Sequence, residues 1–247
     1  MREFRDDAVV LRTYRSGESD RAVVLWTREH GKVRVLAKGA RRSTSRLGGT
    51  LEVLGFVRVD LVATRGEFYI ARHVEHLERL TTLRADYERI TAGYAVVEIV
   101  DAIPADDVAD PAIFDLVVRV LRVLDDAEFS PRLVPAAFAF RLLALDGSAP
   151  VVDECVNCGR PGPLVAFDAQ VGGTLCATCR SGRALSGEAL ALIRRLVGGD
   201  LGAALREAGP AGAGEVAAIA TEAVEQHFGR RLKVARSTPP LEGRADR

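Results

Sequence analysis

Hydrophobic residues in the first 80 positions come in short runs that are rich in β-branched side chains, as in strands. Turn-forming sequences such as SGESD at 16–20 and REHG at 28–31 separate these runs. A glycine at position 55, inside the fourth run, indicates a bulge or a sharp bend. The pattern predicts five strands, at residues 8–14, 21–27, 32–37, 51–63 and 68–74. Five short strands predict a small barrel or sandwich, and the OB-fold is the commonest five-stranded barrel that binds nucleic acid.

From about residue 82 the apolar positions recur every three or four residues, which is the period of a helix. Tyr87 and Tyr94 follow this spacing, and Pro104 ends the first helix. Asp110 before Pro111 is typical of a helix start, because the carboxylate caps the first turn. The helix that follows is apolar over so wide an arc that we expect it to be central. The pattern predicts further helices at residues 131–145, 187–197 and 214–228.

All four cysteines lie within 25 residues, in two CxxC pairs that seventeen residues separate. Two such pairs at this separation match a four-cysteine zinc site. Each CxxC makes a tight turn, which nearby glycines permit, and a hairpin between the pairs brings four thiolates around one metal ion. Four cysteines leave no position open for water, so the sequence predicts one structural zinc per chain. The expected ligands are Cys155, Cys158, Cys176 and Cys179.

Other uses of these cysteines are disulfides, a redox CxxC, free thiols in the core or an iron–sulfur cluster. Disulfides are disfavoured because the N-terminus has charges where an export signal needs its apolar stretch. A thioredoxin-like redox site needs one CxxC near a βαβ unit, and common iron–sulfur motifs have different spacings.

The fold class that follows is α+β and multi-domain: an N-terminal five-stranded β-barrel of the OB-fold type, then an α-helical domain with an inserted four-cysteine zinc-binding segment. We expect the barrel at residues 1–80 and the helical domain at 81–150 and 184–235. The zinc segment spans residues 151–183, and a polar, proline-containing disordered tail spans 236–247.

The formal net charge is zero, but the charges are unevenly distributed. Residues 1–80 hold 16 Lys+Arg against 11 Asp+Glu, a balance of +5, and the remainder has a balance of −5. Such asymmetry indicates that only one part meets a polyanion. No apolar run is long enough to span a bilayer, so the sequence predicts a cytoplasmic protein. If the polyanion is DNA, we expect the protein to be nucleoid-associated.

The window from His30 to Leu51 contains six cations and no acidic residue. Guanidinium groups and small residues suit phosphate contact, whereas the plain alternative is a solvated loop. The expected DNA-binding residues are Lys32, Arg34, Lys38, Arg41, Arg42 and Arg46. Aromatic residues on the flanking strands could stack bases or form the barrel core: Trp26, Phe56, Phe68 and Tyr69.

Two histidines at the end of the fifth predicted strand, His73 and His76, are more typical of surface or packing residues than of a metal site. The chain has no phosphate-binding P-loop, nucleophile elbow or metalloprotease helix. We therefore expect a protein that is not an enzyme.

The order of these parts, and several strings, resemble the bacterial RecO family of recombination mediators. The strings are DAVVLRTYRSGESDRAVVLWTREHGKVRVLAKGARR, SRLGGTLE at 45–52 and PVVDECVNCG at 150–159. The resemblance implies an OB domain that binds single- and double-stranded DNA and anneals complementary strands. It also implies work with RecR, contact with the C-terminal tail of single-stranded DNA-binding protein, and help in loading RecA during DNA repair. Some family members lack the cysteines, so the metal is not essential to the common activity.

The residues leave two other functions open. One is a zinc-containing OB-fold protein that binds RNA or the ribosome. The other is an interaction scaffold in which the barrel is inert and the acidic helical part carries the function. For the resemblance's tail-binding pocket, the candidate arginines are Arg119, Arg122, Arg132 and Arg141.

Overall fold

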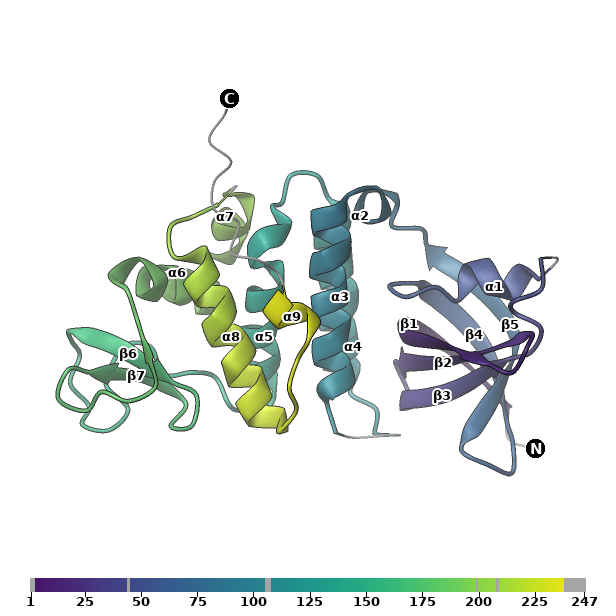
Figure 1. Cartoon of the computed structure of the whole chain (residues 1–247), viewed down its shortest axis with the longest axis horizontal. Coiled ribbons are helices and arrows are strands. Elements are labelled where there is room, and N and C mark those ends of the chain that lie inside the picture. Colours follow the sequence, from purple (N-terminus) through teal and green to yellow (C-terminus); the bar gives the residue numbers. More distant parts are fainter. Residues whose placement is uncertain (1–2, 44, 105–107, 199, 208, 238–247) are drawn as a thin grey trace. The chain divides into compact units, whose positions relative to one another are not determined.

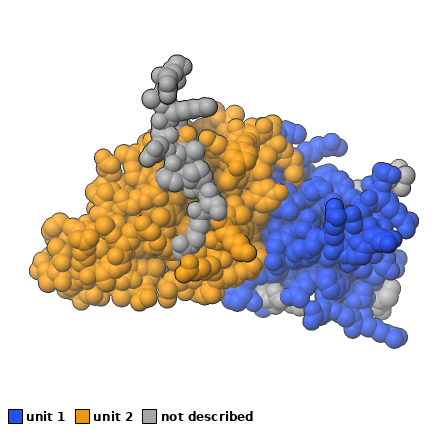
Figure 2. Space-filling model, in the orientation of Figure 1, with its two compact units in different colours: residues 1–81, 103–122 blue, residues 82–102, 123–247 orange. Residues whose placement is uncertain are grey.

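The computed structural model describes residues 3–43, 45–104, 108–198, 200–207 and 209–237. The chain divides into two compact units (Figure 2). One comprises Met1–Thr81 with Ile103–Arg122, and the other Thr82–Ala102 with Val123–Arg247. This division differs from the predicted domains, because residues 103–122 join the N-terminal strands instead of the helical domain.

The N-terminal strands form a closed barrel in the order β1-β2-β3-β5-β4 (Figure 1). β3 and β5 are parallel, and the other pairs are antiparallel. This order confirms the predicted OB-like barrel. The strands are β1 (Glu3–Ser16), β2 (Asp20–Thr27), β3 (Gly31–Ala37), β4 (Phe56–Ala63) and β5 (Phe68–Glu78).

Alternate residues of each strand point inward and fill the barrel. Val23, Leu25, Val33 and Val35 are fully or almost fully buried there. A short helix, α1 (Arg46–Thr50), follows the basic loop, and residues at its two ends pack against the same core. Since alternation sets the two faces of a strand, the even-numbered residues of β2 and β3 point outward.

The fourth strand begins later than predicted. Residues 51–55 form a turn in which the Gly55 N–H donates to the Glu52 carbonyl at 2.9 Å, and Leu54 has a φ of 68°. A side chain at Gly55 would lie 2.9 Å from that same carbonyl oxygen. Gly55 therefore makes a bend before β4, and it does not make a bulge within the strand.

The helix α4 (Pro111–Asp125) begins where the sequence predicts. One carboxylate oxygen of Asp110 accepts from the backbone N–H groups of Ala112 and Ile113, both at 3.0 Å. On the barrel side, the ring of Phe114 lies 6.3 Å from that of Phe56. These contacts explain why α4 up to Arg122 belongs to the barrel unit.

The second unit is a helical bundle in which α5 packs against α3, α6 and α8. Arg89 of α3 donates to four backbone carbonyls, those of residues 124, 126, 127 and 129, and so fixes the end of α4 and the chain that follows it. The elements are α2 (Thr81–Ala85), α3 (Tyr87–Ala102), η1 (Pro131–Leu133), α5 (Val134–Leu145), α6 (Gly187–Val197), α7 (Leu201–Arg206), α8 (Ala213–Phe228) and α9 (Val234–Ser237).

Two expectations for this unit need correction. The tyrosines that set the period of α3 are exposed, Tyr87 to 82% and Tyr94 to 41%, so they do not lie on the buried face of the helix. The expected disordered tail begins inside α9, which includes residues 236 and 237. Residues 238–247 lie outside the described residues.

The cysteine segment is a small three-stranded sheet of order β7-β6-β8. Its strands are β6 (Leu164–Asp168), β7 (Gly173–Cys176) and β8 (Arg183–Ala184). Arg194 of α6 anchors the sheet by donating to the Val152 carbonyl at 3.1 Å and pairing with Asp153 at 3.0 Å. The barrel, the helices and this clustered cysteine segment confirm the predicted α+β fold class.

Candidate metal centre and nucleic-acid interface

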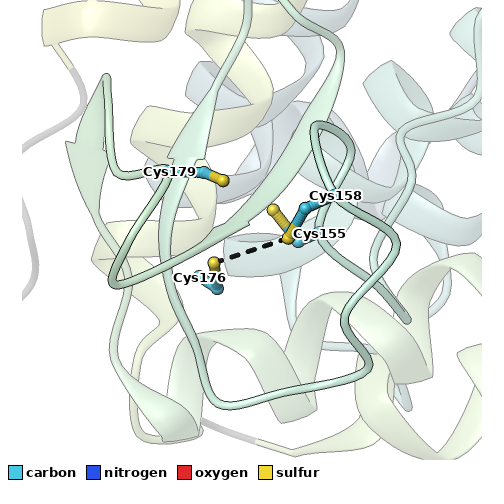
Figure 3. A group of neighbouring side chains, drawn as sticks. All are labelled: Cys155, Cys158, Cys176 and Cys179. Atoms are coloured by element: carbon cyan, nitrogen blue, oxygen red, sulfur yellow. Dashed lines mark hydrogen bonds between the residues drawn. The ribbon is translucent and has the colours of Figure 1, made fainter.

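Four thiols from two turns converge on one point (Figure 3). The sulfur atoms of Cys155, Cys158, Cys176 and Cys179 all lie within 4.8 Å of one another, and those of Cys158 and Cys176 are 3.8 Å apart. A tetrahedron with metal–sulfur distances of about 2.3 Å has sulfur–sulfur edges of about 3.8 Å. The spacing of the thiols therefore fits one tetrahedral metal ion.

Backbone hydrogen bonds shape the two turns. In the first turn, the N–H groups of Cys158 and Gly159 donate to the Cys155 carbonyl, and in the second the Cys179 N–H donates to the Cys176 carbonyl. Gly159 and Gly182 have φ values of +69° and +68°, as the turns predict. A side chain at Gly182 would come within 2.4 Å of the Phe167 carbonyl oxygen, so only glycine fits there.

The ionisation of the thiols is uneven. A hydrogen bond from the Cys176 backbone is the main cause that lowers the pKa of Cys155 to about 6. The backbone of Cys179 likewise lowers the pKa of Cys176. Hydrogen bonding with the Cys158 thiol raises the pKa of Cys179 to about 12. Since clustered thiolates repel one another, full ionisation needs a cation among them, and a soft divalent metal would supply it.

The alternative of disulfides is wrong for this segment. All four cysteines are free, and the 3.8 Å between the sulfurs of Cys158 and Cys176 is far longer than a disulfide bond of about 2.05 Å. Among the described residues this is the one cluster of His, Cys, Asp or Glu side chains with metal-binding geometry. Among the described residues, His73 and His76 belong to no such cluster.

The basic loop, residues 38–45, is braced against the turn between β1 and β2. The Gly39 N–H donates to an Asp20 carboxylate oxygen at 2.8 Å, and the Arg41 N–H donates to the Ser19 carbonyl at 2.9 Å. The Arg41 guanidinium also donates to the carbonyls of Gly17 and Glu18, at 3.3 and 2.9 Å. These contacts hold residues 39–41 in place against the turn, and the Arg41 side chain makes two of them.

Two cations of the loop are open to a ligand. Lys38 and Arg42 are exposed and have no ion-pair partner in the part of the chain that the structure describes. Arg34 is also exposed, and its Nη1 lies 2.9 Å from a carboxylate oxygen of Glu67. Arg46 begins α1, but its side chain lies outside what the structure describes.

Lys32 is not available to a nucleic acid, contrary to expectation. Its side chain is buried, and its ammonium group donates to the backbone carbonyl of Ile103. Burying an ammonium group is costly unless its hydrogen bonds are made, so this contact has a structural role. The sequence places Lys32 among surface cations because strand alternation gives the outward face of β3 without showing what covers it.

The four aromatic residues that could stack bases differ in how far they are buried. Trp26 and Phe56 are buried to 1% and 7% exposure, and Tyr69 packs against the barrel core. Phe68 alone of the four is exposed. Sequence reasoning missed Tyr14 of β1, which is exposed to 44%, and the register of the hairpin is the signal that places it on the outer face.

Both parts of the chain match family models. The model described as Recombination protein O N terminal matches residues 1–80, and that described as Recombination protein O C terminal matches residues 84–236. The chain belongs to the RecO family. This confirms the resemblance, and it makes the protein a recombination mediator in DNA repair and not an enzyme.

Curated relatives in the RecO family cover most of the chain. DNA repair protein RecO of Streptomyces griseus is 38% identical over 208 residues, which are 80% of this chain and 83% of the relative. The protein of the same name from Streptomyces coelicolor is 38% identical over 81% of this chain and 85% of its own. That of Cutibacterium acnes is 39% identical over 73% of this chain and 75% of its own.

Family membership supports the role in DNA repair over the RNA-binding and scaffold alternatives. In the described residues, no helix of this RecO-family chain combines the length and the apolar character needed to cross a membrane.

Proposed function

We propose that this member of the RecO family binds single- and double-stranded DNA and anneals complementary strands. With RecR and single-stranded DNA-binding protein, it would promote RecA loading during DNA repair. One observation carries the proposal: in a chain of this family, a closed OB-like barrel presents exposed cations on a loop that is braced against the β1–β2 turn. Since the substrate is chromosomal DNA, the proposal places the activity at the nucleoid.

Phosphate contact would come from the basic loop. Lys38 and Arg42 are the foremost contacts, because they are exposed and unpaired among the described residues. Arg34, Arg41 and Arg46 would assist them from the strand, the loop and the start of α1. Annealing requires two polyanions to approach, and cations held in a fixed arrangement lower their mutual repulsion without reading bases.

We propose zinc as the metal of the four-cysteine centre, one ion per chain. Four thiolates in a tetrahedral arrangement suit zinc, and such a site is closed to water. Cys155, Cys158, Cys176 and Cys179 would hold it and so fix the turns that flank β6 and β7. The metal would stabilise this sheet and take no part in annealing.

For the acidic tail of single-stranded DNA-binding protein, the structure separates the four candidate arginines. Arg122 pairs with Glu78, and Arg132 lies 3.6 Å from Glu88. Arg119 and Arg141 are exposed and have no ion-pair partner in the described part of the chain. We therefore propose Arg119 and Arg141 as the first candidates for the tail carboxylates.

A strand-annealing experiment tests the proposed function. Complementary DNA oligomers, bare or coated with cognate single-stranded DNA-binding protein, are mixed with the purified protein, and RNA oligomers of the same sequence serve as comparison. We expect the protein to accelerate annealing of both DNA pairs. No acceleration on either DNA pair would overturn the proposal, and acceleration of the RNA pair alone would favour the RNA-binding alternative.

A further inference from the structure

The strand register aligns two rows of side chains across the barrel. Phe68 of β5 lies beside Arg34 of β3, and both share a row with residues of β1 and β2. The next row begins at Tyr14 of β1. The rows are Arg12, Val24, Arg34, Phe68 and Tyr14, Ala22, Leu36, Ile70.

Both rows lie on the outer face of the barrel. Their neighbours Val23 and Val35 are in the barrel core, and Tyr69 packs against it. Because side chains alternate along a strand, residues 22, 24, 34, 36, 68 and 70 must face outward. Tyr14 and Phe68 are exposed to 44% and 41%, whereas Ala22 and Val24 of β2 are exposed to only 7% and 3%.

Cations accompany the two exposed rings. The guanidinium carbon of Arg12 lies 5.6 Å from the centre of the Tyr14 ring, within the range of a cation–π contact. Arg34 is the register partner of Phe68, and its pairing with the exposed Glu67 is an interaction that a phosphate can replace at small cost. Each exposed ring thus has a guanidinium group beside it, and the buried β2 residues Ala22 and Val24 lie between the two pairs. We call the two pairs together the ring face: Arg12, Tyr14, Arg34 and Phe68.

The ligand that suits the ring face is a polyanion with exposed flat groups. Single-stranded DNA presents both phosphates and unpaired bases, and bases stack on aromatic rings and guanidinium planes without regard to sequence. A duplex hides its bases in the stack. Tyr14 and Phe68 are three strand spacings apart, roughly 14 Å along the sheet, so they would contact different bases of one strand.

We propose that the ring face binds single-stranded DNA by stacking unpaired bases on Tyr14 and Phe68, beside the phosphate contacts of the basic loop. This inference rests on the proposed DNA-binding function and deepens it, because it names unpaired bases as recognised groups. The protein would then hold a single strand by two independent means, one electrostatic and one through stacking.

Removal of the bases tests the proposal. Two fluorescent DNA oligomers of equal length, one with its bases and one abasic, carry the same phosphates. At one salt concentration, any difference in the protein's affinity for them therefore comes from contacts with the bases. We expect the protein to prefer the oligomer with bases, and the variant Tyr14→Leu/Phe68→Leu to lose at least about fivefold in affinity for it. Affinity for the abasic oligomer and the salt dependence should stay unchanged.

Two controls separate stacking from a general effect. Tyr87→Leu removes a tyrosine that is more exposed but lies on α3, so it should leave both affinities unchanged. Tyr14→Phe retains the ring and should retain the preference, which also shows that the fold tolerates change there.

The outcomes distinguish this inference from the proposed function. A protein that binds neither oligomer overturns the proposed function together with the ring face. A protein that binds both oligomers equally, or a double variant that weakens on both by the same factor, overturns the ring face and leaves DNA binding through phosphates intact.

Discussion

Hydrogen bonding and burial sort the barrel's basic residues into two groups. Arg21 donates to the carbonyls of Gly48 and Leu51, at 3.0 and 3.2 Å, and so fixes the end of α1. Arg41 fixes the β1–β2 turn in the same way. Lys38 and Arg42 have no comparable contact among the described residues. Basic residues that are clustered in a sequence can therefore have two different roles. Some hold the loop in place, and others are exposed and able to contact a ligand.

Arg41 is for this reason a poor choice for a test of DNA binding. A variant that lacks its guanidinium would release the carbonyls of Gly17 and Glu18, and the loop would change shape with its charge. Variants at Lys38 and Arg42 remove charge and leave the bracing hydrogen bonds in place.

Lys32→Met should lower stability and spare DNA binding. Methionine keeps the apolar stem but removes the donor to the Ile103 carbonyl, and an unsatisfied buried group costs about 1–3 kcal/mol. Urea unfolding measures the change, and the exposed Arg34→Met should alter the free energy of unfolding by less than about 0.5 kcal/mol. A Lys32→Met protein of full stability and weakened DNA affinity would restore Lys32 to the interface.

Strands and helices could be read from the sequence wherever the hydrophobic period was unambiguous. The N-terminal strands are short runs rich in β-branched residues between turn sequences, and Asp110 with Pro111 marks the start of α4, so both predictions are confirmed. In α3 most of the second half is apolar, from Ala92 to Ala102, and a nearly continuous apolar surface does not show which side is buried. The exposure of Tyr87 and Tyr94 follows from tertiary packing, which no local pattern contains.

The cysteine site was predictable for a different reason. Ligand spacing is set by the geometry of two turns and a hairpin, which are local in sequence, so four residues sufficed to predict a metal site. The contacts that anchor the sheet were not predictable, because Arg194 lies 42 positions from the Val152 carbonyl that it holds.

The four-cysteine centre should lose its metal when one ligand is removed. Cys176→Ser should abolish metal binding and destabilise the three-stranded sheet β7-β6-β8. The control Thr178→Ala changes a residue inside the same CxxC and should retain the metal. Metal analysis of the two purified variants measures the metal content of each. A Cys176→Ser protein with a full equivalent of zinc would refute the four-cysteine centre.

Metal affinity should also rise with pH. A proton must leave Cys179, whose pKa is raised to about 12, before the fourth thiolate can bind, so protons compete with the metal near neutral pH. Competition with a chelating dye at pH 6.5, 7.5 and 8.5 should show increasing affinity. An affinity that is flat over this range would mean that the thiols are already ionised without metal.

At the scale of the whole molecule, the net charge of zero is the sum of two parts of opposite charge. The barrel half carries the positive balance, and the remainder carries the negative one. A polyanionic strand should therefore bind the barrel strands and their loops, and an acidic protein tail needs local arginines on the helices. The proposal for Arg119 and Arg141 addresses the second requirement.

A peptide with the acidic, apolar-ended tail of single-stranded DNA-binding protein should bind at low salt. Arg119→Ala or Arg141→Ala should weaken that affinity about tenfold or more, if its guanidinium bonds a tail carboxylate. Arg122→Ala is the matched control, because Glu78 already engages that guanidinium. Calorimetric titration with the peptide measures the affinity of each of the three variants. Arg119→Ala and Arg141→Ala proteins that bind the peptide as tightly as the Arg122→Ala control would exclude both candidates.

The dependence of single-strand affinity on salt tests the proposed DNA interface most directly. Each phosphate neutralised on a single strand contributes about −0.7 to the slope of log affinity against log salt. Lys38→Ala/Arg42→Ala should flatten this slope by about 1.4, weaken binding to all sequences alike and slow annealing in parallel. Arg119→Ala/Arg141→Ala removes the same charge from exposed helical positions and should leave the slope unchanged. A Lys38→Ala/Arg42→Ala protein that is folded, metal-loaded and unchanged in slope would contradict the basic loop as the DNA-binding element.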